Sequence, residues 1–229
     1  GAERAAEPGI DLLLVGGALN SDATLTAEDV QAIGDPTEAA LVSAAALSEL
    51  RKPELERAFP RVAEVPFDSD RKRMTTLHRS PRTAAEMPAS LASIWADLTD
   101  PNLPGPPYVA FTKGAIDGLL TISKNVWVDG NIRPLDDDWR QRIMASHDQM
   151  AAQGMRVLGV ALRPWEREPD ETTAKAMERD LTLIGMFGLI DPPRPEVRTA
   201  VEQCRAAGIR PVMITGDHPL TARHIAQQV

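Results

Sequence analysis

The sequence first excludes several classes of protein by what it lacks. It has one cysteine, Cys204, among 229 residues, so no disulfide can form within the chain and a reducing compartment fits. No apolar run approaches the ~20 residues that a membrane helix needs; the longest, at residues 183–190, has about half that length. The first residues show no basic stretch followed by an apolar one, so we expect no signal peptide.

Aromatic side chains and positive charge are also scarce. Phe, Trp and Tyr make up 4% of the residues, and the formal net charge is −8. Because nucleic-acid surfaces need a basic face and rings for stacking, we expect no nucleic-acid partner. The 43% hydrophobic and 25% charged content is ordinary for a soluble globular protein with one large domain or two small ones.

Residues 1–182 predict an α+β domain whose antiparallel sheet is flanked by helices. A short apolar segment at residues 12–15 is expected to stop at Gly16 and Gly17. The expected strands cover residues 62–67, 73–78, 108–113, 125–128, 131–134 and 155–162. The expected helices cover residues 35–50, 91–98, a few residues after Gly114, 136–153 and part of an acidic connector at 164–180.

The start of the helix that follows Gly34 carries strong signals. Asp35 is suited to cap it, Pro36 to occupy its first position, and Glu38 to stand third as in a capping box. The dipeptide at residues 129–130, Asp-Gly, predicts a tight hairpin turn.

Residues 183–229 have a different pattern, and we place a domain boundary between residues 182 and 183. A continuous apolar strand at 183–190, a helix at 195–207 and a second apolar strand at 209–214 form a βαβ unit. A further helix begins at Pro219. This part is expected to be a partial parallel α/β segment of the haloacid-dehalogenase-like (HAD-like) kind.

Five short segments together carry a family resemblance. They are GDPTEAAL at residues 34–41, PFDSDRKRM at 66–74, FTKGA at 111–115, DPPR at 191–194 and MITGD at 213–217. In this order they resemble the nucleotide-binding domain of type II P-type cation-transporting ATPases, the calcium-pump-like branch, followed by an early fragment of the phosphorylation domain. The resemblance implies an ATP-binding domain that presents ATP to a phosphorylatable aspartate.

The resemblance also implies roles for particular residues. The implied ATP-binding set is Glu38, Phe67, Lys72, Lys113, Gly114 and Arg156. In it Phe67 stacks on adenine, the three basic residues lie near the phosphates, and Glu38 lies near the adenine amino group. The implied phosphorylation-domain contacts are Asp191, Arg194, Thr215, Gly216 and Asp217.

The residues by themselves leave plainer interpretations open. Phe67 also fits a core position, and the basic run at 71–73 also fits a solvated face. Glu38 needs no ligand if it completes a capping box. The four histidines have no spacing typical of a metal site.

The family's catalytic parts are missing from this sequence. Neither the Asp-Lys-Thr of its nucleophile motif nor its later GDGxND motif occurs. We therefore expect no catalytic residue and no metal site in this chain, which alone should be inactive although the parent pump is an enzyme. ATP, with Mg²⁺ bound to it, and the pump's remaining phosphorylation, actuator and membrane domains are the implied partners. The fragment is expected to be soluble and, in the parent, to lie on the cytoplasmic side of a membrane; the transported cation is not specified.

Two alternatives belong to other functional classes. Asp68 and Asp70 resemble the paired aspartates of HAD-type phosphatases, although position 72 is Lys where that motif has Thr or Val. A non-catalytic interaction module with an acidic surface is the other. We also expect residues 183–214 to be poorly packed and to promote self-association, since apolar strands with open edges invite pairing.

Overall fold

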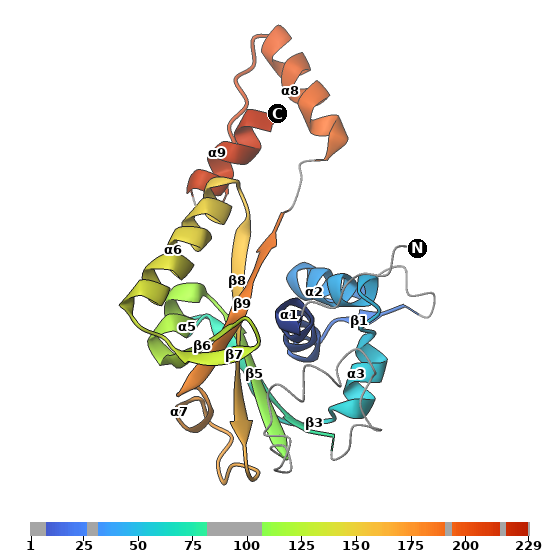
Figure 1. Cartoon of the computed structure of the whole chain (residues 1–229). Coiled ribbons are helices and arrows are strands. Elements are labelled where there is room, and N and C mark those ends of the chain that lie inside the picture. Colours follow the sequence, from blue (N-terminus) through green and yellow to red (C-terminus); the bar gives the residue numbers. More distant parts are fainter. Residues whose placement is uncertain (1–7, 27–31, 82–106, 191–193, 216–218, 229) are drawn as a thin grey trace.

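The computed structural model describes residues 8–26, 32–81, 107–190, 194–215 and 219–228 (Figure 1). Its helices are α1 (Pro8–Leu19), α2 (Pro36–Leu47), α3 (Lys52–Ala58), α5 (Ile116–Ile122), α6 (Asp137–Ala152), α7 (Ala174–Met177), α8 (Pro195–Ala206) and α9 (Pro219–Gln228). Its strands are β1 (Thr24–Leu25), β2 (Ala32–Ile33), β3 (Arg61–Asp68), β4 (Arg73–Arg79), β5 (Tyr108–Gly114), β6 (Ser123–Val128), β7 (Asn131–Pro134), β8 (Arg156–Trp165) and β9 (Leu181–Leu189).

One seven-stranded sheet organises the chain. Its strand order is β3-β4-β5-β8-β9-β6-β7, and β1 and β2 form a separate two-stranded ladder. Neighbouring strands of the large sheet are antiparallel except β6 and β9, which are parallel. The prediction of an α+β fold with a mostly antiparallel sheet flanked by helices is therefore confirmed.

Helices cover both faces of this sheet (Figure 1). On one face, α1 and the helices after it bury a core against β5 and β8, in which Phe111 and Val160 lie under α1. On the other face, α5 and α6 bury a second core against β6, β8 and β9. The short α7 closes a third, small cluster through Met177, which is fully buried.

The prediction that the chain stops at Gly16 and Gly17 is wrong, because α1 runs through both. A Cβ built on Gly16 would lie 2.9 Å from side-chain atoms of Phe111 and Val160, and one on Gly17 would lie 2.9 Å from the Phe187 ring. The two glycines thus let the helix approach the sheet closely, and their packing value outweighs their low helix propensity.

The start of α2 agrees with the prediction except in one respect. Asp35 caps it by accepting hydrogen bonds from the amides of Thr37 and Glu38, at 2.9 and 3.3 Å, and Pro36 follows in the first turn. The Glu38 carboxylate does not complete a capping box; it bonds to a different segment of the chain, described below. One of the competing partners is the buried ammonium group of Lys113, which explains why Glu38 does not bond to its own helix.

The predicted hairpins and the long helix are confirmed. β3 pairs with β4, and β6 pairs with β7 around Asp129 and Gly130. Both turn residues have positive φ, 49° and 78°, as a type I′ turn requires. Asp136 caps α6, and Gly154, with φ of 80°, follows its end.

The predicted second segment is not a separate parallel sheet. Strand β9 lies between β8 and β6 in the large sheet, so the boundary placed between residues 182 and 183 falls inside a strand. Leu183 and Ile184 are buried there against elements that precede them in the chain. The sequence pattern identified the strand correctly but did not show which sheet it joins.

The residues after β9 form helices α8 and α9, as predicted. The structure assigns no strand to residues 209–214, so the predicted second strand of the βαβ unit is absent from this described segment. Its apolar side chains are exposed, Ile214 by 93%. The predicted helix at 91–98 lies outside the described residues.

Candidate functional site

The end of β5 brings a buried lysine to a carboxylate from α2. Lys113 shares its face of the sheet with Phe111, and its side chain is only 8% exposed. Its Nζ donates to Glu38 Oε1 at 2.5 Å and to the Ser21 hydroxyl at 3.2 Å. Burial lowers the pKa of Lys113, and the hydrogen bond and charge of Glu38 oppose that shift. Glu38 thus keeps an ammonium group charged at a mostly buried position.

The chain between α1 and β1 supports this pair. The second oxygen of Glu38 accepts the amides of Asp22 at 2.7 Å and Ala23 at 3.1 Å. Lys52, itself 3% exposed, donates to the carbonyls of Ser21 and Ala23 at 2.6 and 2.7 Å. These bonds hold residues 21–23 so that the amides of Asp22 and Ala23 face the Glu38 carboxylate.

Phe67 and Lys113 lie level with each other on two strands of the sheet, with Met74 of β4 between them. Between the pairs Val65–Thr75 and Asp68–Arg73, strand β3 has one more residue than β4, so a β-bulge places Pro66 and Phe67 opposite Met74. Met74 in turn pairs with Lys113 of β5. Two strand spacings, roughly 10 Å, therefore separate Phe67 and Lys113. The Phe67 side chain is 63% exposed, so the core interpretation of this residue is wrong.

Lys72 and Gly114 meet at the same end of the sheet. Lys72 has a φ of 51°, and its carbonyl accepts the Ala115 amide at 3.1 Å. A Cβ on Gly114 would lie 2.6 Å from that carbonyl oxygen and 2.5 Å from the Arg73 Cβ. Glycine is thus required where β5 passes the β3–β4 turn, which gives the KGA motif a structural reason.

The basic run at residues 71–73 is not uniformly solvated. Arg71 and Arg73 both bond to the buried Glu178, and Arg73 does so at 2.7 Å. Lys72 alone of the three is exposed. The arginines of the motif therefore have structural partners, and the lysine is the member that faces solvent.

Arg156 begins β8 and is exposed. Arg156, Leu158 and Val160 occupy every second position of β8 and therefore lie on one face of the sheet. Val160 packs under α1 on the same face as Phe111. Arg156 and Leu158 therefore belong to the face that also holds Lys113. Phe187 of β9 pairs with Leu158 and reaches the same face.

Of the later predicted contacts, the structure describes Arg194 and Thr215, and both follow β9, the last strand of the sheet that holds this cluster. Arg194 precedes α8 without capping it through its side chain, and Thr215 is exposed in the segment that follows α8. Asp191, Gly216 and Asp217 lie outside the described residues.

Asp68 and Asp70 lie at a hairpin turn. Asp68 Oδ1 accepts the amides of Asp70 at 3.0 Å and Arg71 at 2.8 Å, and the Arg71 amide bond is the main cause of the lowered pKa of Asp68. The two strands joined there are antiparallel. The parallel-strand end that a HAD-type nucleophile requires is therefore not what this segment forms.

The described residues contain neither a cluster of metal ligands nor a helix able to cross a membrane. No three His, Cys, Asp or Glu side chains within these ranges come together as metal ligands would. Likewise, none of the helices described has the length and apolar character needed to cross a bilayer.

Comparison with known proteins agrees with the motifs. The family model described as "P-type ATPase, cytoplasmic domain N" matches residues 10–196. The chain belongs to this family. It is 35% identical to Calcium-transporting ATPase 1 of Bacillus cereus and to the calcium-transporting ATPase of Bacillus subtilis, over 95% of its own length. It is 33% identical, over 94% of its length, to the probable cation-transporting ATPase F of Mycobacterium bovis.

The chain spans about a fifth of the length of these relatives, 21% of the first and 22% of the second. Its match to domain N includes the whole large sheet, from β3 to β9, and ends at the start of α8. The family match therefore agrees with the sheet topology in keeping β9 with the preceding strands.

Sequence reasoning missed three residues of the candidate site in this domain N. Ser21 touches the Lys113 ammonium, and Leu158 and Phe187 share its face of the sheet. The position of Leu158, two residues after Arg156 in one strand, was a usable signal. Ser21 and Phe187 required the tertiary structure, because nothing local links them to the motifs.

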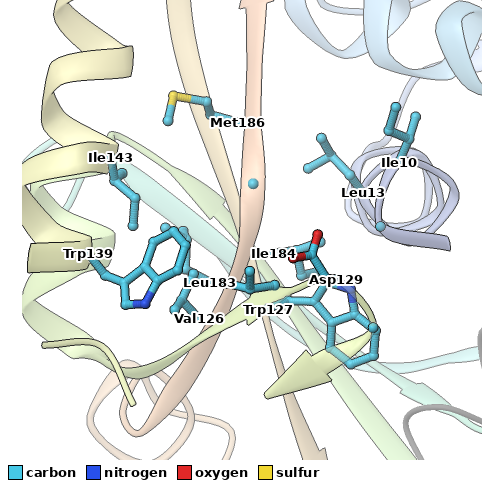
Figure 2. A pocket seen from close by; sticks show the side chains of 14 residues that line it. Ile10, Leu13, Val126, Trp127, Asp129, Trp139, Ile143, Leu183, Ile184 and Met186 are labelled. Carbon is cyan, nitrogen blue, oxygen red and sulfur yellow. The ribbon is translucent and has the colours of Figure 1, made fainter. Parts of the chain in front are cut away.

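A separate pocket of about 860 Å³ lies elsewhere in domain N, on the side of β6 and β9 (Figure 2). Figure 2 shows Ile10 and Leu13 facing it from α1, and Trp139 and Ile143 facing it from α6. None of the residues predicted to bind ATP lines it. The volume of this pocket alone is therefore no evidence that the nucleotide binds there.

Proposed function

We propose that this chain is the ATP-binding part of a P-type cation-transporting ATPase and presents ATP to a phosphorylatable aspartate outside the chain. The observation that carries the proposal is the exposed Phe67 ring on one cross-strand line with the Lys113–Glu38 pair. An exposed ring two strand spacings from a fixed ammonium group suits a nucleotide, whose base stacks and whose phosphates are anionic.

The remaining site residues have roles that follow from their positions. Phe67 stacks on the adenine, and Lys72, Lys113 and Arg156 interact with the phosphates. Glu38 orients Lys113 and meets the adenine edge, while Gly114 allows the close approach of β5 to the Lys72 carbonyl. Mg²⁺ would enter with the nucleotide.

The rest of the parent protein supplies the other partners in this proposal. The nucleotide-binding unit runs to the end of β9 rather than to residue 182, and the residues after it belong to the phosphorylation domain. There Asp191, Arg194, Thr215, Gly216 and Asp217 make that domain's contacts. The names of the relatives, which include calcium-transporting and cation-transporting ATPases, support cation transport, including calcium transport, by a hydrolase and translocase of this kind.

The test is a titration of ATP against the amide chemical shifts of the labelled chain. We expect a dissociation constant of about 1 mM, equivalent to about −4 kcal/mol, because one ring and a few cations make the contacts. Phe67→Ala should weaken binding about tenfold, since stacking contributes ~1–3 kcal/mol. Ile132→Ala, which shortens another exposed side chain at the far edge of the sheet, is the matched control. Equal affinity of Phe67→Ala and the parent chain would refute the stacking role.

The chain alone should not hydrolyse ATP. Phosphoryl transfer needs a positioned nucleophile together with Mg²⁺, and the Asp-Lys-Thr segment is absent. After incubation with radiolabelled ATP we expect no acid-stable aspartyl phosphate. Stoichiometric labelling of Asp68 or Asp70 would instead support the phosphatase alternative.

A further inference from the structure

We infer that Glu178, directly after α7, is a positioning residue for the nucleotide site, because its carboxylate holds the β3–β4 turn that carries Phe67 and Lys72. This inference rests on the proposed ATP site. Glu178 is separated from that turn by more than one hundred residues, and its own element takes no part in the site.

Three donors from β4 and the turn before it converge on this carboxylate. Its side chain is 1% exposed; Arg73 Nε donates to Oε2 at 2.7 Å, and Arg71 Nη1 donates to Oε1. The Thr75 hydroxyl lies 3.3 Å from Oε1 and 2.9 Å from the Thr112 hydroxyl of β5. A carboxylate buried this deeply needs such partners, and two of them flank Lys72 directly.

Arg71 extends the constraint to Phe67. The same guanidinium that bonds to Glu178 donates through Nη2 to the Pro66 carbonyl at 2.8 Å. The Arg71 amide also donates to Asp68 Oδ1 at 2.8 Å. The residues on both sides of Phe67 are therefore bonded to Arg71, Pro66 through the guanidinium that Glu178 holds and Asp68 through the backbone amide.

The constraint on Lys72 acts through its backbone. Its φ of 51° lies in the left-handed region, which costs free energy for a residue other than glycine and persists only where neighbours enforce it. Arg73 Nη1 donates to the Arg71 carbonyl at 3.3 Å on one side, and the Ala115 amide donates to the Lys72 carbonyl on the other. Glu178 holds both arginines that flank this strained residue, so losing its charge should release the turn.

The first measurement needs no nucleotide. Glu178→Gln keeps the size of the side chain and removes its charge, and we expect the Ala115 amide to exchange with solvent about tenfold faster. Asp180→Asn is the matched control, because Asp180 stands two residues away and pairs with Lys124 at the surface. In the control the Ala115 exchange rate should stay within about twofold of the parent rate.

The second measurement is the ATP titration. We expect Glu178→Gln to raise the dissociation constant about three- to tenfold and Asp180→Asn to leave it unchanged. Lys72→Asn, which tolerates the left-handed backbone, removes the lysine itself. If Glu178 acts partly through Lys72, the double variant should raise the dissociation constant by less than the product of the two single fold-changes. General destabilisation would not produce this coupling.

The outcomes separate the two proposals. If the parent chain shows no ATP-dependent shifts, the proposed function fails. If the parent binds ATP and Glu178→Gln binds equally well, the positioning role is refuted. If both variants weaken binding and their effects are independent, the part of the role that acts through Lys72 is refuted. If Glu178→Gln does not fold, Arg71→Gln replaces it, because that variant keeps the bond between Arg73 and Glu178. We then expect a smaller increase in Ala115 amide exchange and a smaller loss of ATP affinity. Unchanged exchange and unchanged affinity would refute the inference.

Discussion

Ionisable side chains buried beside the sheet give this domain N its clearest residue-scale properties. His78 of β4 is fully buried, with Nδ1 2.9 Å from the Phe59 carbonyl oxygen and Nε2 2.9 Å from the Thr76 hydroxyl. Burial lowers the pKa of His78 from 6.5 to about 4. The ring is therefore neutral at pH 7, and it donates from Nδ1 and accepts at Nε2.

The first prediction concerns this histidine. Between pH 6.5 and about 4 the unfolded chain binds a proton that the folded chain excludes, so the free energy of unfolding should fall as the pH falls. The fall should be on the order of 3 kcal/mol and should be visible in urea unfolding across that range. His78→Gln should flatten the dependence, whereas His147→Gln on α6 should not. An unchanged slope in His78→Gln would assign the effect to other groups.

The second prediction concerns the Lys113–Glu38 pair. Lys113→Met leaves a carboxylate that is 14% exposed without its cation, and we expect the free energy of unfolding to drop by about 3 kcal/mol. Lys124→Met breaks the pair with Asp180, whose side chains are 71% and 41% exposed, and should cost less than about 1 kcal/mol. Chemical unfolding of both variants makes the comparison, and equal losses would show that burial does not strengthen the first pair.

At the scale of elements, α1 shows how packing overrides propensity. A helix with consecutive glycines is a poor helix by itself, and the sequence pattern accordingly predicted a stop. The sheet face beneath it, with Phe111, Val160 and Phe187, leaves room only for glycine. Neither glycine has a positive φ, so their function is close approach rather than a turn.

The third prediction tests this packing. Gly16→Ala adds a methyl group 2.9 Å from Phe111 and Val160, and we expect a net destabilisation of about 1–2 kcal/mol despite the better helix propensity of alanine. Gly9→Ala in the same helix meets only the Trp127 ring, at 3.7 Å, and should be neutral or stabilising by up to about 1 kcal/mol. Thermal unfolding of the two variants measures the difference; a stabilised Gly16→Ala would contradict the close packing.

At the scale of the whole molecule, β9 belongs to the large sheet, although the sequence pattern assigned most of it to a second segment. It pairs with β8 on one side and β6 on the other, so the sheet is not complete until residue 189. The expectation that residues 183–214 as a whole lack a core is therefore wrong for β9. The exposed apolar side chains of residues 209–214 still fit an interaction surface, and self-association through them stays a prediction.

The fourth prediction follows from this division. A chain that ends after residue 190 should keep its fold and its ATP affinity, whereas one that ends after residue 180 should lose cooperative unfolding because two strands lose their shared neighbour. Light scattering should show the full chain associating and the chain ending at 190 remaining monomeric. Association of both would locate the contact before residue 190, and a folded chain ending at 180 would contradict the role of β9.

Features that depend on local chemistry were predictable from the sequence alone. Caps, turns and alternation predicted the start of α2, both hairpins and α6, because Asp35, Gly130 and Asp136 act on the backbone within a few residues. The ordered motifs also identified the family and pointed to a candidate site at the ends of β3 and β5.

Features that depend on residues far apart in the chain became visible only in the folded structure. It assigned β9 to the large sheet, carried α1 through its glycines and directed Glu38 to Lys113 instead of to its own helix. It also joined Glu178 to the β3–β4 turn. In each case the deciding free energy comes from burying a group against a partner that sequence periodicity does not reveal, so local preference alone could not predict it.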